Sequence, residues 1–303
     1  MPASEISLPL RIGARTLVTL RRRLVRRGLS LKEGLEGGAP ALPPLGQGEH
    51  GYLVTALPAA ALDALVARHE GLKPFVRQLY RRYYARLDLD FDAYLAGFSA
   101  KSRSTCRRKL RKLAERSGGA LDLRCYRGEE EIEAFHAKAR ALSARTYQER
   151  LLDAGLPDGP EALAQMRALA RAGRARGWLL FLDGAPIAYL WAPAEGATLI
   201  YAHLGHDPDF AEYSPGTVLQ LEAMRQLMAE KAFRLFDFTE GEGQHKSLFA
   251  TGGVDCLDLL LLRPTAGNLL AGHALNGFDR GVRLAKKAAT ALGLKRALRR
   301  LRR

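Results

Sequence analysis

Apolar residues in this chain occur either in short runs, which are typical of strands, or at the spacing of a helix. The change from one pattern to the other marks the boundaries of the expected elements. Short apolar runs bounded by turns predict strands over 178–182, 185–192, 197–203, 234–238 and 256–262. Asp183-Gly184 separates the first two runs and favours a tight hairpin turn. After the third run, apolar residues recur at helical spacing from Val218 to Met228. The pattern therefore predicts an α/β (α+β) protein in which a strand meander is followed by a helix crossover.

The start of this helix is the first candidate site. Ser214 is expected to cap the helix, Pro215 suits its first position, and Gly216 permits the close approach of a ligand. A helix start carries N–H groups without intrahelical partners and the positive end of the helix dipole, so it suits a phosphate. Taken alone, a capped helix that binds nothing is the commoner case. The stretch is not a Walker motif.

The N-terminal part has a different composition. Residues 10–27 contain seven arginines and no acid, which is typical of a strand or of a basic amphipathic arm. A Gly/Pro linker follows at 37–48. Beyond it the pattern predicts a strand over 51–57 and a helix that starts at Pro58. A second helix is expected to carry the apolar residues Phe75, Val76, Tyr80 and Tyr83.

A basic segment occupies the middle of the chain. Lys101–Lys112 places seven basic residues in twelve positions with no acid. In a helix, Arg103, Arg107 and Arg111 share a face that suits a bidentate grip on phosphate; a solvated helix face is the alternative. Further helices are expected over 129–147, which ends at Tyr147, and over 161–172.

The tail and the overall composition point to an anionic partner. Ten basic residues and no acid lie between Arg280 and Arg303, interleaved with apolar ones, which favours an amphipathic helix on an anionic membrane; a nucleic-acid arm and a solvated tail are the alternatives. The net charge is +15. No apolar run reaches the roughly 18 residues that span a bilayer, and arginines interrupt the N-terminal apolar stretch, so a cytoplasmic protein at the inner face of the membrane is expected.

Four motifs, in order, carry a resemblance to a known family. They are KSRSTCRRKLRKL at 101–113, DGAPIAYLWA at 183–192, YSPGTVL at 213–219 and FDFTEGEGQHKSLF at 236–249. Together they resemble the GNAT acyltransferase superfamily, in its FemAB-like and CelD-like branch, over roughly residues 90–264. Thr239 and His245 depart from the pattern, since many relatives have Gly and Tyr there.

The resemblance implies a GNAT fold, with a mixed, mostly antiparallel sheet flanked by helices. It also implies a reduced N-terminal GNAT-like half and a basic helical tail. The expected domains are a basic arm and linker over 1–46, the reduced half with its basic helix over 47–120, a catalytic domain over 121–264, and the tail over 265–303.

Acyl transfer to an amine needs a group that accepts the amine's proton, and it needs no cysteine or serine nucleophile. Glu240 is the first candidate base because it lies in a polar loop beyond a strand end; Asp237, between two phenylalanines, is either a base or a buried structural carboxylate. The other catalytic candidates are His203 and Tyr147. The expected donor-binding residues are Tyr213, Ser214, Pro215, Gly216, Thr217 and Val218, and the expected acceptor-binding residues are Arg103, Arg107, Arg111, His245 and Lys246. Cys106, Cys125 and Cys256 are scattered, so neither a disulfide framework nor a metal site is expected.

The sequence thus predicts an N-acyltransferase that moves an acyl group from acyl-CoA to an amine. The acceptor is expected to be a lipid of the sphingoid type, as in bacterial ceramide synthases, or a polysaccharide precursor. Aminoacyl transfer from charged tRNA and a non-catalytic module that binds membranes or nucleic acid are the alternatives.

Overall fold

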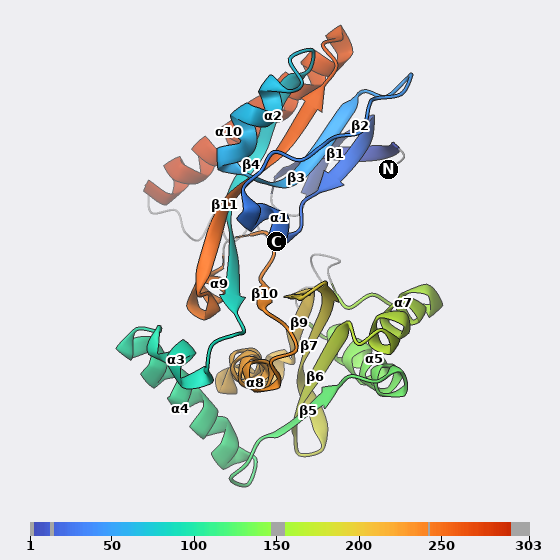
Figure 1. Ribbon diagram of the computed structural model, residues 1–303. Coiled ribbons are helices and arrows are strands. Elements are labelled where there is room, and N and C mark those ends of the chain that lie inside the picture. The colour runs from blue at the N-terminus through green and yellow to red at the C-terminus, as the bar shows by residue number, and fades with distance from the viewer. Residues whose placement is uncertain (1–2, 13–14, 147–154, 242, 292–303) are drawn as a thin grey trace. The chain divides into compact units, whose positions relative to one another are not determined.

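The computed structural model describes residues 3–12, 15–146, 155–241 and 243–291. The chain forms two compact units (Figure 1). Unit 1 comprises Met1–Arg81 and Val254–Arg303, and unit 2 comprises Arg82–Gly253. These units divide the chain at other points than the domain boundaries expected from the sequence, which stay a prediction.

Unit 1 is a sheet with helices on both faces. Its strands lie in the order β1 (Ser4–Ile12), β2 (Arg15–Gly28), β3 (Gly51–Pro58), β11 (Gly252–Leu262) and β4 (Lys73–Arg86). The helices are α1 (Leu31–Glu36), α2 (Leu62–Ala67) after a 3-10 turn η1 (Ala59–Ala61), and α10 (Ala266–Ala291). Leu259 of β11 packs in a cluster with Leu65 of α2, whereas its neighbour Leu260 packs with Leu275 of α10. Because successive strand residues point to opposite faces, α2 and α10 cover opposite sides of this sheet.

One expected helix is wrong. The stretch with Phe75, Val76, Tyr80 and Tyr83 forms strand β4. Its apolar residues fit a helical period, but they are aromatic and β-branched types that favour strands. Pairing with neighbouring strands therefore decided the outcome over local periodicity.

Unit 2 contains a second set of strands. Their order is the end of β4, β10 (Leu235–Asp237), β8 (Thr198–Ile200), β7 (Ala185–Glu195), β6 (Ala175–Leu182) and β5 (Asp122–Tyr126), with β9 (His203–His206) also paired to β7. The helices are α3 (Phe91–Ala96), α4 (Ala100–Arg116), α5 (Glu129–Ser143), α7 (Pro160–Arg171), α8 (Pro215–Glu230) after the 3-10 turn η2 (Pro208–Tyr213), and α9 (Gln244–Phe249). Most pairings are antiparallel; β8 with β10 is parallel. The predicted mixed, mostly antiparallel sheet flanked by helices is confirmed.

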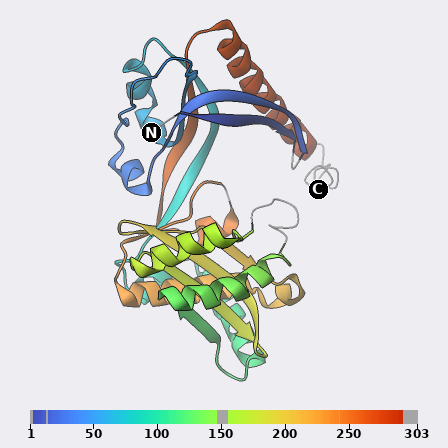
Figure 2. The same cartoon turned by 90° about the vertical axis from the view of Figure 1, so that its right-hand side faces the viewer.

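Two helical layers enclose the strands of unit 2. α5 and α7 contact each other and cover one face, as Figure 2 shows from the front. α8 packs on β6 and β7 from the other face and is itself contacted by α3 and α4. Trp178 and Phe236 are fully buried beneath α8, and Phe135 of α5 is fully buried on the opposite side. This packing holds the start of α8 rigidly against the strand ends.

The local predictions for unit 2 were mostly confirmed. The hairpin turn lies at Asp183-Gly184, where both residues have positive φ (52° and 77°) as a tight primed turn requires. The basic segment is helix α4, and α8 begins at Pro215. The single strand expected over 197–203 is instead interrupted at Tyr201 and Ala202, and this break positions the candidate site.

Candidate active site

The site begins where two adjacent strands separate. Leu199 of β8 pairs with Ala194 of β7 on one side and Phe236 of β10 on the other. After the Tyr201 amide donates to the Asp237 carbonyl (2.8 Å), the chain continues as β9, which follows β7, while β10 ends at Asp237. The parallel neighbours therefore diverge, and a wedge opens between β9 and the segment after β10.

A cavity of about 320 Å³ lies at this wedge. The lining residues come from β9 and the break before it, from the η2–α8 junction and α8, and from α9; they are Tyr201, Leu204, His206, Ala211, Ser214, Gly216, Thr217, Gln220, His245 and Phe249. In β9, side chains alternate between the two faces, so Leu204 and His206 share a face and His203 points to the other. The described lining contains His206 and not His203.

The start of α8 forms one wall of the cavity. Ser214 adopts a left-handed conformation (φ 52°, ψ 49°), and its side chain makes no capping hydrogen bond, so its expected role as a side-chain cap is wrong. The Ser214 carbonyl instead accepts from the amides of Thr217 (3.0 Å) and Val218 (3.2 Å). Ser214 lines the cavity together with Gly216 and Thr217.

The other expected donor-binding residues are placed differently. Pro215 and Val218 are buried in the helix packing. The ring of Tyr213 lies under the Lys112 ammonium, 4.7 Å from Nζ to the ring centroid. A Cβ at Gly216 would lie 3.1 Å from Leu204 Cδ2 and 3.6 Å from His206 Nδ1. Glycine therefore keeps the cavity wall open at this point.

Two imidazoles and one phenol supply groups that can transfer protons. Burial lowers the pKa of His206, although the Asp207 carboxylate opposes the shift. Partial desolvation by neighbouring groups, aided by the Lys246 charge, lowers the pKa of His245, whose side chain stays exposed. Both rings are therefore neutral at pH 7 and can accept a proton. Burial raises the pKa of Tyr201, so its phenol keeps its proton and can donate it. The Tyr201 and His245 rings lie 6.0 Å apart between centroids.

The acidic candidates lie outside the described cavity lining. Asp237 is buried, with 1% of its surface exposed, and both of its oxygens accept from Arg82. Its Oδ1 also accepts from the Thr239 amide at 2.8 Å. Glu240 is exposed, and its carbonyl accepts a hydrogen bond from Lys246 Nζ. Burial lowers the pKa of Lys246 while the charges of Asp237 and Glu240 oppose this.

Helix α4 presents two lysines, not its arginine row, to the start of α8. Lys109 Nζ lies 3.3 Å from Thr217 Oγ1, and Lys112 Nζ lies 3.0 Å from Glu212 Oε2. Arg103 donates to the carbonyls of Ala96 (3.0 Å) and Phe98 (2.5 Å) and so holds the turn after α3.

The remaining predicted residues of α4 and α5 are placed as follows. Arg107 and Arg111 are exposed, and Arg111 Nε lies 3.9 Å from Glu115. Tyr147, expected to line the acceptor side, lies outside the described residues.

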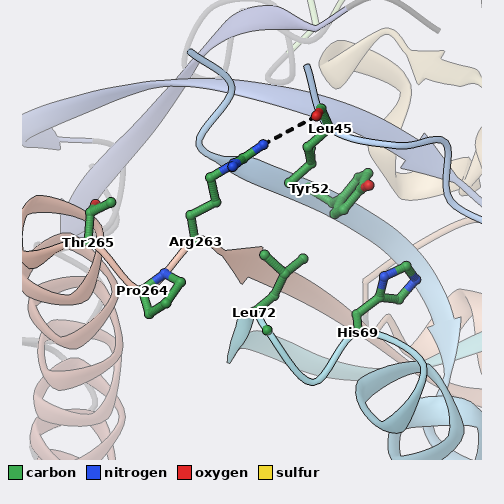
Figure 3. A pocket seen from close by; sticks show the side chains of 8 residues that line it. Leu45, Tyr52, His69, Leu72, Arg263, Pro264 and Thr265 are labelled. Carbon is green, nitrogen blue, oxygen red and sulfur yellow. Dashed lines mark hydrogen bonds between the residues drawn. The ribbon is translucent and has the colours of Figure 1, made fainter. Parts of the chain in front are cut away.

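A second cavity, of about 560 Å³, lies within unit 1 (Figure 3). The Arg263 guanidinium there donates to the carbonyls of Leu45 and Gly46, each at 3.2 Å. The Tyr52 hydroxyl donates to the Pro43 carbonyl, and the Tyr52 ring lies 5.8 Å from that of His69. These polar groups are engaged by the protein itself, so the cavity of unit 2 is the stronger candidate for the active site. No group of three or more His, Cys, Asp and Glu residues suited to a metal ion occurs in the described part of the chain.

The part of the chain that forms most of this cavity matches a known family. Residues 100–247 match the family model of the acetyltransferase (GNAT) domain. This stretch is a GNAT domain. It contains every described lining residue of the cavity except Phe249, and the predicted resemblance is confirmed. No protein of curated function shows significant sequence similarity to the chain.

Two solved structures share the fold at low sequence identity. The crystal structure of FemX has a TM-score of 0.52 and 12% identity, over 86% of this chain and 88% of that one. The C-terminal domain of a protein named as a lysylphosphatidylglycerol synthetase, from Agrobacterium fabrum, has a TM-score of 0.51 and 14% identity, over 75% of this chain and 71% of that one. At such identities the likeness shows the fold alone.

The sequence did not single out several residues that line the cavity. Gln220 lies among the apolar residues of α8. Phe249 and Tyr201 are aromatic residues, a type that usually packs in a core. Helix α9, which contributes His245 and Phe249, was expected as a polar loop. His206 carried a signal, because it sits just before the capped helix, but nothing local distinguished it from His203.

Proposed function

We propose that the GNAT domain of this chain is an N-acyltransferase that takes its acyl group from acyl-CoA and transfers it to an amine. The observation that supports this most directly is the wedge cavity, where neutral His206 and protonated Tyr201 face the start of α8. A phosphate-bearing donor suits that helix start, because Lys109 adds a positive charge beside Thr217.

The proposed reaction needs no covalent enzyme intermediate. The amine nitrogen attacks the carbonyl carbon of the thioester, and its proton passes to the neutral imidazole of His206. The new C–N bond forms and the C–S bond breaks. Tyr201 gives its proton to the leaving thiolate. The phenolate then takes up a proton from solvent and the His206 imidazolium releases its proton to solvent, so both groups return to their starting states. Asp237 holds the segment after β10 through Arg82 and Thr239 and takes no proton in this scheme.

The acceptor is proposed to be an amine on a lipid or on a polysaccharide precursor at a membrane surface. None of the helices in the described ranges has the length and apolar character needed to cross a bilayer. Unit 1 exposes large apolar side chains on two basic elements, with Leu17 and Val18 on β2 and Leu270 and Leu284 on α10. Such a mixture of apolar and basic groups favours contact with anionic headgroups.

Incubation with acyl-CoAs of several chain lengths, with and without an extract of lipids and sugar nucleotides, tests the proposal by mass spectrometry. Release of CoA and an acyl mass gained by one acceptor would support it and would identify the acceptor class. Vesicles that contain phosphatidylglycerol, compared with pure phosphatidylcholine vesicles in a sedimentation assay, test the membrane contact. Equal binding to both vesicles would contradict it.

A second candidate is aminoacyl transfer from charged tRNA. The exposed basic face of α4, with Arg107, Arg108 and Arg111, favours it because such a row suits a nucleic-acid backbone. Activity with aminoacyl-tRNA and none with any acyl-CoA would favour this alternative. Binding of lipid or nucleic acid without any transfer would favour a non-catalytic module.

A further inference from the structure

Gln220 is a buried amide to which no residue in the described part of the chain offers a hydrogen bond. It lies in the second turn of α8 with 3% of its surface exposed. Neither its Nε2 nor its Oε1 has a hydrogen-bond partner among the described residues, and both atoms are shielded from solvent. The side chain lines the wedge cavity. On the same face of the helix, Gly216 and Thr217 line the cavity one turn before Gln220, and Ala223 and Met224 are apolar and fully buried one turn after it.

The same helix shows how a structural glutamine behaves. Two turns further on, Gln226 Oε1 accepts a hydrogen bond from Trp178 Nε1 at 2.8 Å. That contact satisfies the indole of a fully buried tryptophan. Gln226 therefore has a role in packing, whereas Gln220 has two polar groups directed at a cavity. A buried donor and acceptor left open in this way need a partner from outside the chain.

We propose that Gln220 determines specificity for the acyl donor by binding an amide-bearing arm of the donor. This inference rests on the proposed function. A chain of amides offers both a C=O that can accept from Nε2 and an N–H that can donate to Oε1. A donor that carried only ester or alkyl groups beside its thioester would leave at least half of Gln220 unsatisfied.

The position of Gln220 fits such an arm. It lies five residues beyond Pro215, which corresponds to about 7.5 Å along a helix axis. A donor whose anionic group binds at the helix start can therefore reach Gln220 with the amide-bearing chain that follows that group. Leu204 and Phe249 form apolar walls of the same cavity. Exclusion of water by these walls makes each hydrogen bond to Gln220 count more in binding.

Calorimetric titration of the full chain with coenzyme A and with adenosine 3′,5′-bisphosphate tests the proposal. The second ligand keeps phosphates and lacks the amide arm. We expect Gln220→Leu to weaken coenzyme A binding by about tenfold and adenosine bisphosphate binding by less than about twofold. Gln220→Glu, which keeps the acceptor and loses the amide donor, should show a smaller loss than Gln220→Leu. In turnover, Gln220→Leu should raise KM for the acyl donor with kcat largely kept.

Thermal unfolding of the free protein separates a binding role from a structural one. We expect Gln220→Leu to keep or raise the Tm, because it removes an unsatisfied buried amide. The matched control Gln226→Leu should lower the Tm, since it leaves Trp178 Nε1 without its partner, and should change coenzyme A affinity by less than about twofold.

Three outcomes would overturn the inference. Unchanged coenzyme A affinity in Gln220→Leu would show that Gln220 does not bind the donor and that buried water satisfies it. Equal losses for both ligands would show a general disturbance of the cavity. Wild-type protein that binds adenosine bisphosphate and coenzyme A equally, or binds neither, would show that Gln220 does not bind the amide arm. Failure to bind coenzyme A at all would also refute the donor class of the proposed function.

Discussion

Arg82 and Asp237 form a buried, two-point ion pair in unit 2. Arg82 Nε lies 3.1 Å from Asp237 Oδ1, and Arg82 Nη2 lies 2.5 Å from Asp237 Oδ2. The exposed fractions of the two side chains are 10% and 1%. Because β10 ends at Asp237, this pair anchors the edge of the wedge from which the active-site segments diverge.

We expect Asp237→Asn to destabilise the protein by about 3–5 kcal/mol, because it removes the carboxylate charge that faces the buried Arg82 guanidinium. The free energy of unfolding in urea is the measurement. Asp88→Asn is the matched control, since Asp88 pairs with Arg86 at the surface, with both side chains more than half exposed. That variant should show little change. Should Asp237→Asn match the control in stability and still lose turnover, Asp237 would have to be returned to the catalytic groups.

His206 predicts a particular pH dependence. In the proposed reaction the neutral ring of His206 is the active form, and burial lowers its pKa below 6.5. The kcat, measured with donor and acceptor both saturating, should therefore stay level from pH 8 down to pH 6.5 and fall only at lower pH, as the ring of His206 takes up a proton. A fall in kcat that already begins above pH 6.5 as the pH is lowered would contradict neutral imidazole as the base.

Replacement of the same ring separates proton transfer from packing. His206→Ala should lower kcat by about 10²–10⁴ with donor binding retained, because a positioned general base contributes that much. His203→Ala is the control from the same strand, on the face turned away from the cavity. A loss of similar size in both variants would indicate damage to β9 and not loss of a base.

Local residue patterns were sufficient to predict much of unit 2. Asp183-Gly184, the apolar stripe of α8 and Pro215 at its first position each encode their element within a few residues. The interruption at Tyr201 and Ala202 is not local, because it depends on β7 continuing beside β9 while β10 ends. Sequence reading therefore located the helix at the site and missed the wedge that makes it a site.

The candidate site residues also fall into two groups: those whose position local sequence sets, and those whose position depends on tertiary packing. Ser214, Gly216 and Thr217 line the cavity because they lie at the helix start, whose position is fixed locally; their expected role in donor binding stays a prediction. Gln220 was hidden, since its surroundings are known only once α8 is packed. β4 was mistaken for a helix for a related reason, because pairing with distant strands overrode its local period.

Glu240→Gln decides between the base expected from the sequence and the base that the cavity favours. Glu240 is exposed and does not contribute to the described lining, whereas His206 does. We expect turnover of Glu240→Gln to stay within about twofold of wild type, since a general base would be worth 10² or more. A fall of that larger size would restore Glu240 as the base and assign His206 to binding.

The two faces of α4 predict separate effects on the two substrates. Lys109 lies beside Thr217 at the start of α8, so Lys109→Ala should weaken binding of adenosine 3′,5′-bisphosphate by roughly fivefold, with a shallower dependence on salt. Arg107 and Arg111 are exposed on that helix, and their replacement by glutamate should leave this affinity nearly unchanged and raise KM for an anionic acceptor. Calorimetry across a salt series and acceptor kinetics check the two effects. If both replacements weakened the nucleotide equally, α4 would act through its overall charge and not through the contact of Lys109 with Thr217.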